Sequence, residues 1–313
     1  MLDTSPWALA TLLSKLVAYA GFVSLAGLLF LFWLGARPAA GGAGTGASCW
    51  PSALRERLIS RALLLGYAAL AAQLLYFLLQ VGQINQNGLR GMLDSFMAGI
   101  LLQSSVGHGL LLRAAALMLL LAGLWLARPA LLAQQAMRLP PRLLLSWLAG
   151  LLLYALSFAV LGHVASLSLP AQVAIVLHTV AISLWVGALP ALYLLCERES
   201  ADRMLPLLQR FGVWGWGILG SLLVSGVFLL TQLLQTPGEI LATPYGRVLA
   251  GKLLLVLGLF SLGALNKFHL VPALTRSGAG RLRQSIAVER ILALLVLLLT
   301  AALTTLTGPE HMG

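Results

Sequence analysis

Five histidines are the side chains of this sequence best suited to chemistry, because nearly all of the chain around them is apolar. A polar group within or beside a bilayer is costly and tends to face the interior of a helix bundle. Four of the five lie at or near the same end of the apolar segments, and the fifth lies near the other end. The four are His108, His163, His178 and His311, and the fifth is His269. The four grouped imidazoles are therefore candidates for binding or transferring a ligand.

Two of these histidines, His163 and His178, are separated by the short segment VASLSLP at 164–170. A connection of this length makes the two flanking helices antiparallel neighbours. Both imidazoles can then reach one outward-facing cavity, and His178 shares a helix face with Trp185. The alternative is that His178 only forms a hydrogen bond with a neighbouring helix.

Thioethers accompany the imidazoles, since Met92 and Met97 lie in the mixed segment 82–107 and Met312 follows His311 directly. Methionine and histidine together suit the soft ion Cu(I), and neutral imidazole also accepts Cu(II). The predicted copper ligands are His163, His178, His108, His311, Met312, Met92 and Met97. The alternatives are that Met92 and Met97 anchor an interfacial helix and that the last residues form a disordered tail.

The elements that must position these residues are membrane helices. Of the 313 residues, 60% are hydrophobic and 9% are charged, and the mean hydropathy is +0.95. Soluble domains have about 25% charged residues, and one membrane span needs about 20 apolar residues. Eight such runs are present, at 7–34, 59–81, 108–126, 143–163, 171–196, 211–234, 247–271 and 284–306. Because the runs are continuously apolar, we predict an all-α polytopic bundle of eight transmembrane helices rather than a barrel.

The net charge of +11 indicates the orientation of this bundle rather than a nucleic-acid partner. Most of the 20 basic residues fall in the loops after the first, third, fifth and seventh runs. Under the positive-inside rule these loops are cytoplasmic, so both termini are expected to be periplasmic. The expected location is the bacterial inner membrane, with the four grouped histidines on the outer side. The five exceptions belong to the opposite side or to helix interiors, and they are Lys15, Arg90, Arg113, Arg247 and Lys252.

Two regions are expected along the chain. Residues 1–142 would contain the first three transmembrane helices and an outer interfacial segment at 82–107, which is too short and mixed to span. Residues 143–313 would contain the last five helices. On the inner side, only His269, Asn266 and Cys196 stand out as polar or metal-binding positions.

Short motifs in the second region resemble the copper resistance D (CopD) domain of bacterial inner membranes. They are RFGVWG at 210–215, SG at 225–226, TPYGRVLAGK at 243–252, NKFHLVPAL at 266–274 and RLRQSIAVE at 281–289. Upstream, HTVAISLWVGALPAL at 178–192 is similar to the family's helix with a histidine before WVG. The resemblance covers roughly the last 140 residues, with the CopD-like domain at about 209–309. Lys267 stands where the family commonly has arginine.

The resemblance implies a periplasm-facing membrane protein that takes copper inward, beside a small periplasmic copper-binding partner of the CopC type. The sequence contains no fused CopC domain and no Met-rich periplasmic loop, so a separate carrier would have to supply the ion. No P-loop is present either, so transport would be passive or coupled to a gradient.

Two other functions compete with copper import. Paired histidines on neighbouring helices, His163 with His178 or His108 with His178, could be the axial ligands of a b-type haem in an electron carrier. Alternatively, the protein is a membrane assembly or scaffold subunit in which the histidines are incidental. An enzyme is not expected, because the sequence has no evident nucleophile–base pair and no HExxH motif.

Overall fold

The computed structural model describes residues 5–36, 50–133, 139–161, 166–233 and 238–305. Its long helices are α1 (Pro6–Gly35), α2 (Ser52–Asn85), α5 (Ser105–Ala133), α6 (Pro141–Ala159), α7 (Leu169–Arg198), α8 (Ala201–Leu233), α10 (Pro244–Leu265) and α12 (Gly280–Leu303). α10 continues into a π-helical turn, η2 (Asn266–Leu270). Among the described residues, eight helices are long and apolar enough to cross a membrane, so the predicted eight-helix membrane bundle is confirmed. Within the described residues there is no β-strand.

The outer segment at 82–107 contains two short helices instead of the single one expected. They are α3 (Gly88–Gly91) and α4 (Ser95–Leu102). α2 ends because Gln86 and Gly88 both adopt positive φ angles, of 53° and 58°, which a right-handed helix does not allow. The Asp94 carboxylate then caps α4 by accepting from the Met97 N–H at 3.0 Å, and this hydrogen bond lowers the pKa of Asp94.

Several helix ends differ from the predicted spans because hydropathy identifies only the part of a helix that lies in the membrane. α2 and α8 begin well before their apolar runs, at Ser52 and Ala201, since their first turns are polar yet helical. The span predicted at 143–163 was too long, because α6 ends at Ala159 with Val160 as its C-cap. His163, which was predicted to end this span, lies outside the described residues.

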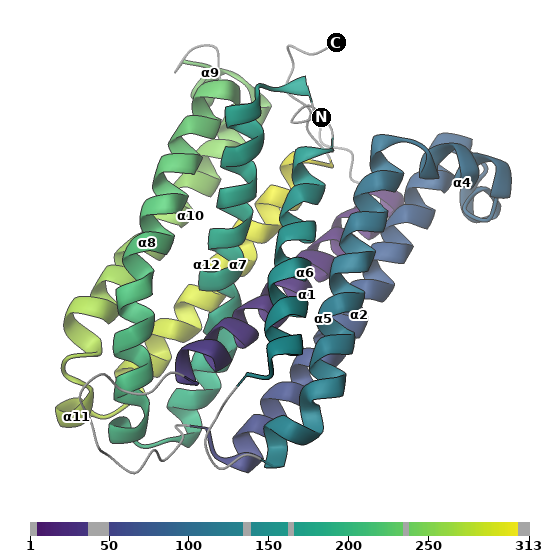
Figure 1. Ribbon diagram of the computed structural model, residues 1–313. Helices are drawn as coiled ribbons and strands as arrows, with labels where there is room; N and C mark the ends of the chain where they lie inside the picture. The colour runs from purple at the N-terminus through teal and green to yellow at the C-terminus, as the bar shows by residue number, and fades with distance from the viewer. Residues whose placement is uncertain (1–4, 37–49, 134–138, 162–165, 234–237, 306–313) are drawn as a thin grey trace.

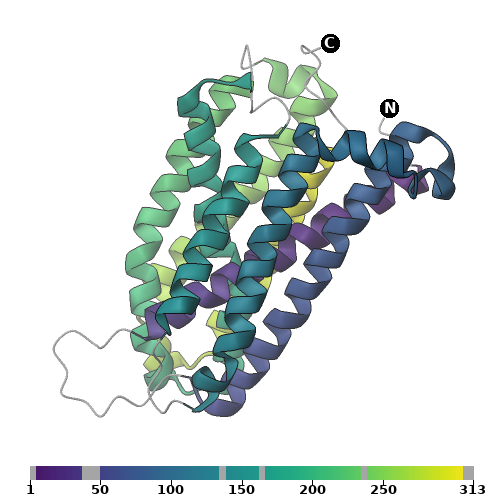
Figure 2. The same ribbon diagram turned by 45° about the vertical axis from the view of Figure 1, so that its right-hand side comes forward.

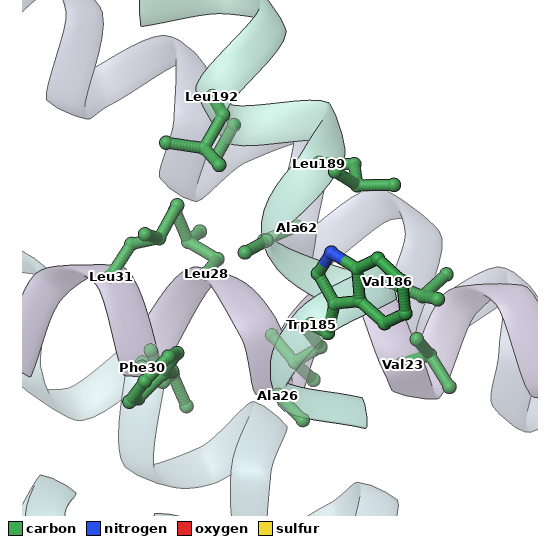
Figure 3. Packing of buried hydrophobic residues seen from close by; sticks show 14 of the residues in the cluster. Val23, Ala26, Leu28, Phe30, Leu31, Ala62, Trp185, Val186, Leu189 and Leu192 are labelled. Carbon is green, nitrogen blue, oxygen red and sulfur yellow. The ribbon is translucent and has the colours of Figure 1, made fainter. Parts of the chain in front are cut away.

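Helix α1 is the centre of the bundle and crosses the other helices obliquely (Figures 1 and 2). It packs against α2, α7 and α12, and 72% of its most apolar 18-residue stretch is buried inside the protein. At the crossing with α7, Gly27 and Gly187 face each other so closely that a Cβ on either would overlap the opposite backbone. Small residues at membrane helix crossings allow this approach. Figure 3 shows the surrounding apolar side chains of the two helices, including Val23, Leu28 and Trp185.

The two ends of the bundle differ in their connections (Figure 1). One end, which we call the terminal end, contains the start of α1, the end of α12, α4 and the short α9 (Glu239–Ala242). Lys15 of α1 joins Thr304 just after α12 at this end, with an Nζ–Oγ1 distance of 2.9 Å. The opposite end, which we call the arginine-rich end, contains the α7–α8 turn and α11 (Leu274–Ser277). That the terminal end faces the periplasm stays a prediction of the positive-inside rule.

Candidate functional site

His178 of α7 is turned toward α8, in the half of the bundle nearer the terminal end. Its Nδ1 lies 3.1 Å from Ser225 Oγ. The Ser225 hydroxyl donates its own hydrogen to the Ser221 carbonyl, so its oxygen accepts from His178 Nδ1–H. The other ring nitrogen, Nε2, is then the unprotonated one. An imidazole oriented through Nδ1 in this way offers Nε2 as a metal ligand.

Gly226, the residue after Ser225, lies beside the His178 ring. A Cβ added to Gly226 would lie 3.5 Å from His178 Cε1, in ordinary van der Waals contact. Lys252 of α10 is also within electrostatic range of the imidazole. The His178 layer is therefore positively charged, and a metal cation would have to be held there by coordination rather than by charge.

An aromatic pair lies next along the same helices toward the arginine-rich end. The Trp185 and Phe260 rings are stacked, with centroids 5.6 Å apart and planes inclined by 16°. Trp185 follows His178 by seven residues on α7, which is about 10 Å along the helix axis. This pair of apolar rings separates the His178 layer from the polar groups deeper in the bundle.

A second polar layer lies beyond the aromatic pair. Glu289 of α12 is only 2% exposed, and its Oε1 accepts from Asn266 Nδ2 at 3.0 Å. The Asn266 Oδ1 atom is buried without a hydrogen-bond partner within the described part of the chain. Both side chains line a cavity of about 80 Å³ that Trp185 also borders. Two oxygen-bearing side chains thus face a small internal space.

The backbone at this layer is irregular. Asn266 opens the π-helical turn η2, where Val271 N–H donates to Asn266 O at 2.8 Å. Such turns widen a helix locally and occur often at functional sites. The turn also positions Lys267, whose ammonium donates to the Gly212 carbonyl and lies 4.2 Å from the centre of the Trp216 ring. Among the described residues Lys267 makes no ion pair with Glu289, so the buried carboxylate has an amide as its side-chain partner.

The other predicted ligands do not gather around His178 in the described structure. His108 is exposed near the start of α5, whereas Met97 packs against a small apolar cluster that includes Phe77 and Leu101. Met92 lies against Gly82. His163, His311 and Met312 lie outside the described residues, so the structure does not test them.

No preformed metal site is present in the parts of the chain that the structure describes, if three or more His, Cys, Asp or Glu side chains are required. The proposed haem pair of His108 and His178 gains no support, since one is exposed on α5 and the other is turned toward α8. The partner of the second haem pair, His163, is not described.

Two further intramembrane cations form a separate cluster near the terminal end. Lys15 is hydrogen-bonded to the Thr304 and Thr305 hydroxyls. Arg113 donates from Nε to Ser157 Oγ at 2.9 Å and lies over the Phe158 ring at 4.4 Å. Neither forms an ion pair with a described carboxylate. These hydrogen bonds and ring contacts stabilise the buried charges without creating an attractive site for a metal cation.

Glu289 is the functional candidate that sequence reasoning missed. It appeared only as the last residue of the motif RLRQSIAVE, although it lies inside the run predicted as the eighth span. An acidic residue within a membrane helix is rare and usually functional. Applied to position 289, that rule would have identified Glu289 as a candidate.

Part of the chain is similar to known proteins. Residues 205–303 match the family model described as copper resistance protein D, CopD. A curated relative, "Copper transport protein CutJ" of Bacillus subtilis (strain 168), is 30% identical over 139 residues, which is 43% of this chain and 25% of the relative. The chain thus spans about a quarter of the length of that relative. No solved structure matches the chain.

Proposed function

Because residues 205–303 form a CopD domain in a multi-pass bacterial membrane protein, we propose that this protein transports copper ions inward across the membrane. The path runs from the terminal end through α7, α8, α10 and α12. The observation that supports it most strongly is the pair of polar layers, His178 with Ser225 and Glu289 with Asn266. These residues lie on α7, α8, α12 and the η2 turn that continues α10.

His178 is the proposed first ligand inside the membrane. With the proton on Nδ1, its Nε2 has the lone pair that a metal ligand needs, and Ser225 holds the ring in that orientation. Imidazole nitrogen accepts copper in both common oxidation states. Because His178 is the only strong ligand at this layer among the described residues, binding is expected to be weak enough for the ion to leave again, as conduction requires.

Glu289 and Asn266 are the proposed second station. Their oxygens line the inner cavity, and the buried carboxylate would compensate the charge of an arriving cation. The stacked Trp185 and Phe260 rings lie between the two stations, so the ion would pass beside them when the pair separates. Of the three inner positions noted in the sequence, this station includes Asn266, and it adds the Glu289 carboxylate.

The remaining predicted ligands are proposed to capture the ion before it reaches His178. They are His108, His163, His311, Met312, Met92 and Met97. A periplasmic copper-binding protein of the CopC type is the proposed donor. Met92 and Met97 have apolar neighbours, so their thioethers would take part only after local rearrangement of the outer segment.

Copper uptake into proteoliposomes tests the proposal. The His178→Ala variant is expected to slow uptake about tenfold or more, since even the loss of a group that orients a ligand lowers metal affinity by about 10–100-fold. The matched control is His269→Ala, which removes an exposed histidine from η2 and should leave uptake unchanged. Wild-type protein that gives no uptake above empty liposomes would refute transport, and unchanged uptake by His178→Ala would refute its role.

A further inference from the structure

A groove of about 330 Å³ lies in the half of the bundle nearer the arginine-rich end, between α1, α2, α7 and α12. It is distinct from the cavity at Glu289, and the two share no lining residue. Its walls include three arginines from three different helices, Arg61 of α2, Arg198 of α7 and Arg290 of α12. Glu197 is the one acidic residue among its lining residues, and the rest of the groove is mainly apolar.

The charge in this groove is not neutralised by the described residues. Arg198 pairs with Glu197 at 3.5 Å, in a contact that is largely exposed. Arg61 and Arg290 form no ion pair with any described carboxylate. The Arg290 guanidinium lies 4.7 Å from the centre of the Tyr193 ring, which restrains its position. The groove therefore has a net positive charge and at least one restrained guanidinium, which suits a planar, bidentate interaction with a phosphate.

An apolar surface continues from the arginines toward the middle of the bundle. α2 and α12 both start at the arginine-rich end, so Leu65 and Leu294 lie one turn deeper than Arg61 and Arg290. These leucines are 41% and 49% exposed. Leu58 and Ala62 add buried apolar surface to the groove. Basic groups at one end and exposed leucines deeper in the membrane match a ligand with an anionic head and a hydrocarbon chain.

We propose that this groove binds one anionic phospholipid from the leaflet at the arginine-rich end. The headgroup phosphate is held by Arg61 and Arg290 with help from Arg198, and an acyl chain lies along Leu65 and Leu294. Basic pockets between membrane helices bind such headgroups. A free phosphate would satisfy the arginines but would leave the leucines without a partner. The proposal does not depend on copper transport.

The test measures lipid binding to the purified full-length protein, which is kept in a neutral detergent that contains phosphatidylcholine. Phosphatidylglycerol is titrated in, and its apparent Kd is obtained from the rise in Tm. In the double variant Arg61→Gln with Arg290→Gln this Kd should increase about a hundredfold, since two charge-assisted interactions are lost. The matched control is Arg57→Gln with Arg283→Gln, which removes two exposed arginines from the same helices outside the groove and should bind like wild type.

Two outcomes would overturn the proposal directly. If both double variants bind phosphatidylglycerol like wild type, the groove is not the site. If inorganic phosphate at equal concentration raises Tm as much as phosphatidylglycerol does, the ligand is a soluble anion instead of a lipid. Native mass spectrometry of the wild type tests the lipid preference without depending on the folding of any variant. One phosphatidylglycerol should remain bound in preference to phosphatidylcholine, and equal retention of the two would also refute the proposal.

Discussion

His178 and Glu289 illustrate how one polar side chain in a membrane helix acquires a role through its partner. Ser225 accepts from His178 Nδ1–H and so leaves Nε2 unprotonated. Asn266 donates to Glu289 and has a buried oxygen without a hydrogen-bond partner among the described residues. In each pair the partner both orients the side chain and reduces the cost of burying it. The two pairs therefore are the chemically competent points of the proposed path.

The inner station can be tested by replacing Glu289 with glutamine. The Glu289→Gln variant keeps the shape and the hydrogen bond to Asn266 but loses the carboxylate charge, an interaction of about 1.5 kcal/mol or more with a bound cation. Copper uptake into proteoliposomes should fall about tenfold. The exposed Glu56, which contacts Arg128 at 3.6 Å, provides the control Glu56→Gln, with no expected change. Uptake by Glu289→Gln at the wild-type rate would remove this station from the path.

Helix packing determines where those side chains point. α7 touches α1 through Gly187 and α8 through His178, so its small residue lies on one face and its functional residue on another. Close approach at Gly187 fixes the rotation of α7 about its axis. The direction of His178 and Trp185 toward α8 and α10 follows from that rotation.

The close crossing predicts a specific effect of adding one methyl group. In Gly187→Ala the new Cβ would overlap the Val23 carbonyl, and overpacking of this kind costs about 1–3 kcal/mol. The variant should therefore unfold at a lower temperature in detergent. Gly220→Ala is the matched control, because a Cβ at Gly220 of α8 has no neighbour within 4 Å, and alanine favours a helix. Equal Tm values for both variants would mean that the crossing is looser than the structure indicates.

The whole molecule combines a central oblique helix with a flanking group of helices that match the CopD family model. α1 packs against helices from both predicted regions, α2 on one side and α7 and α12 on the other. The division at 142 stays a prediction. The even number of spans returns α12 to the end where α1 begins (Figure 1), which agrees with the expectation that both termini share one side.

Which compartment that side faces can be measured by labelling single cysteines after both native cysteines are replaced. Leu89→Cys in α3 places a thiol at the terminal end, where Leu89 is 76% exposed. Ser277→Cys in α11 places one at the arginine-rich end. In right-side-out vesicles a membrane-impermeant maleimide should label the first position only, because arginine-rich loops stay cytoplasmic. If only Ser277→Cys were labelled, the protein would have the opposite orientation, and the proposed path would run in the opposite direction.

The sequence by itself determined that this is a membrane bundle of eight helices, because hydropathy over about 20 residues is a local property that needs no tertiary contact. It also indicated the resemblance to CopD and marked His178 as a candidate ligand. Only the tertiary structure decided which polar groups meet. Ser225 is 47 positions from His178, and Asn266 is 23 positions from Glu289. Such pairings depend on how α7, α8, η2 and α12 are rotated and packed, and side-chain contacts between separate helices set those rotations.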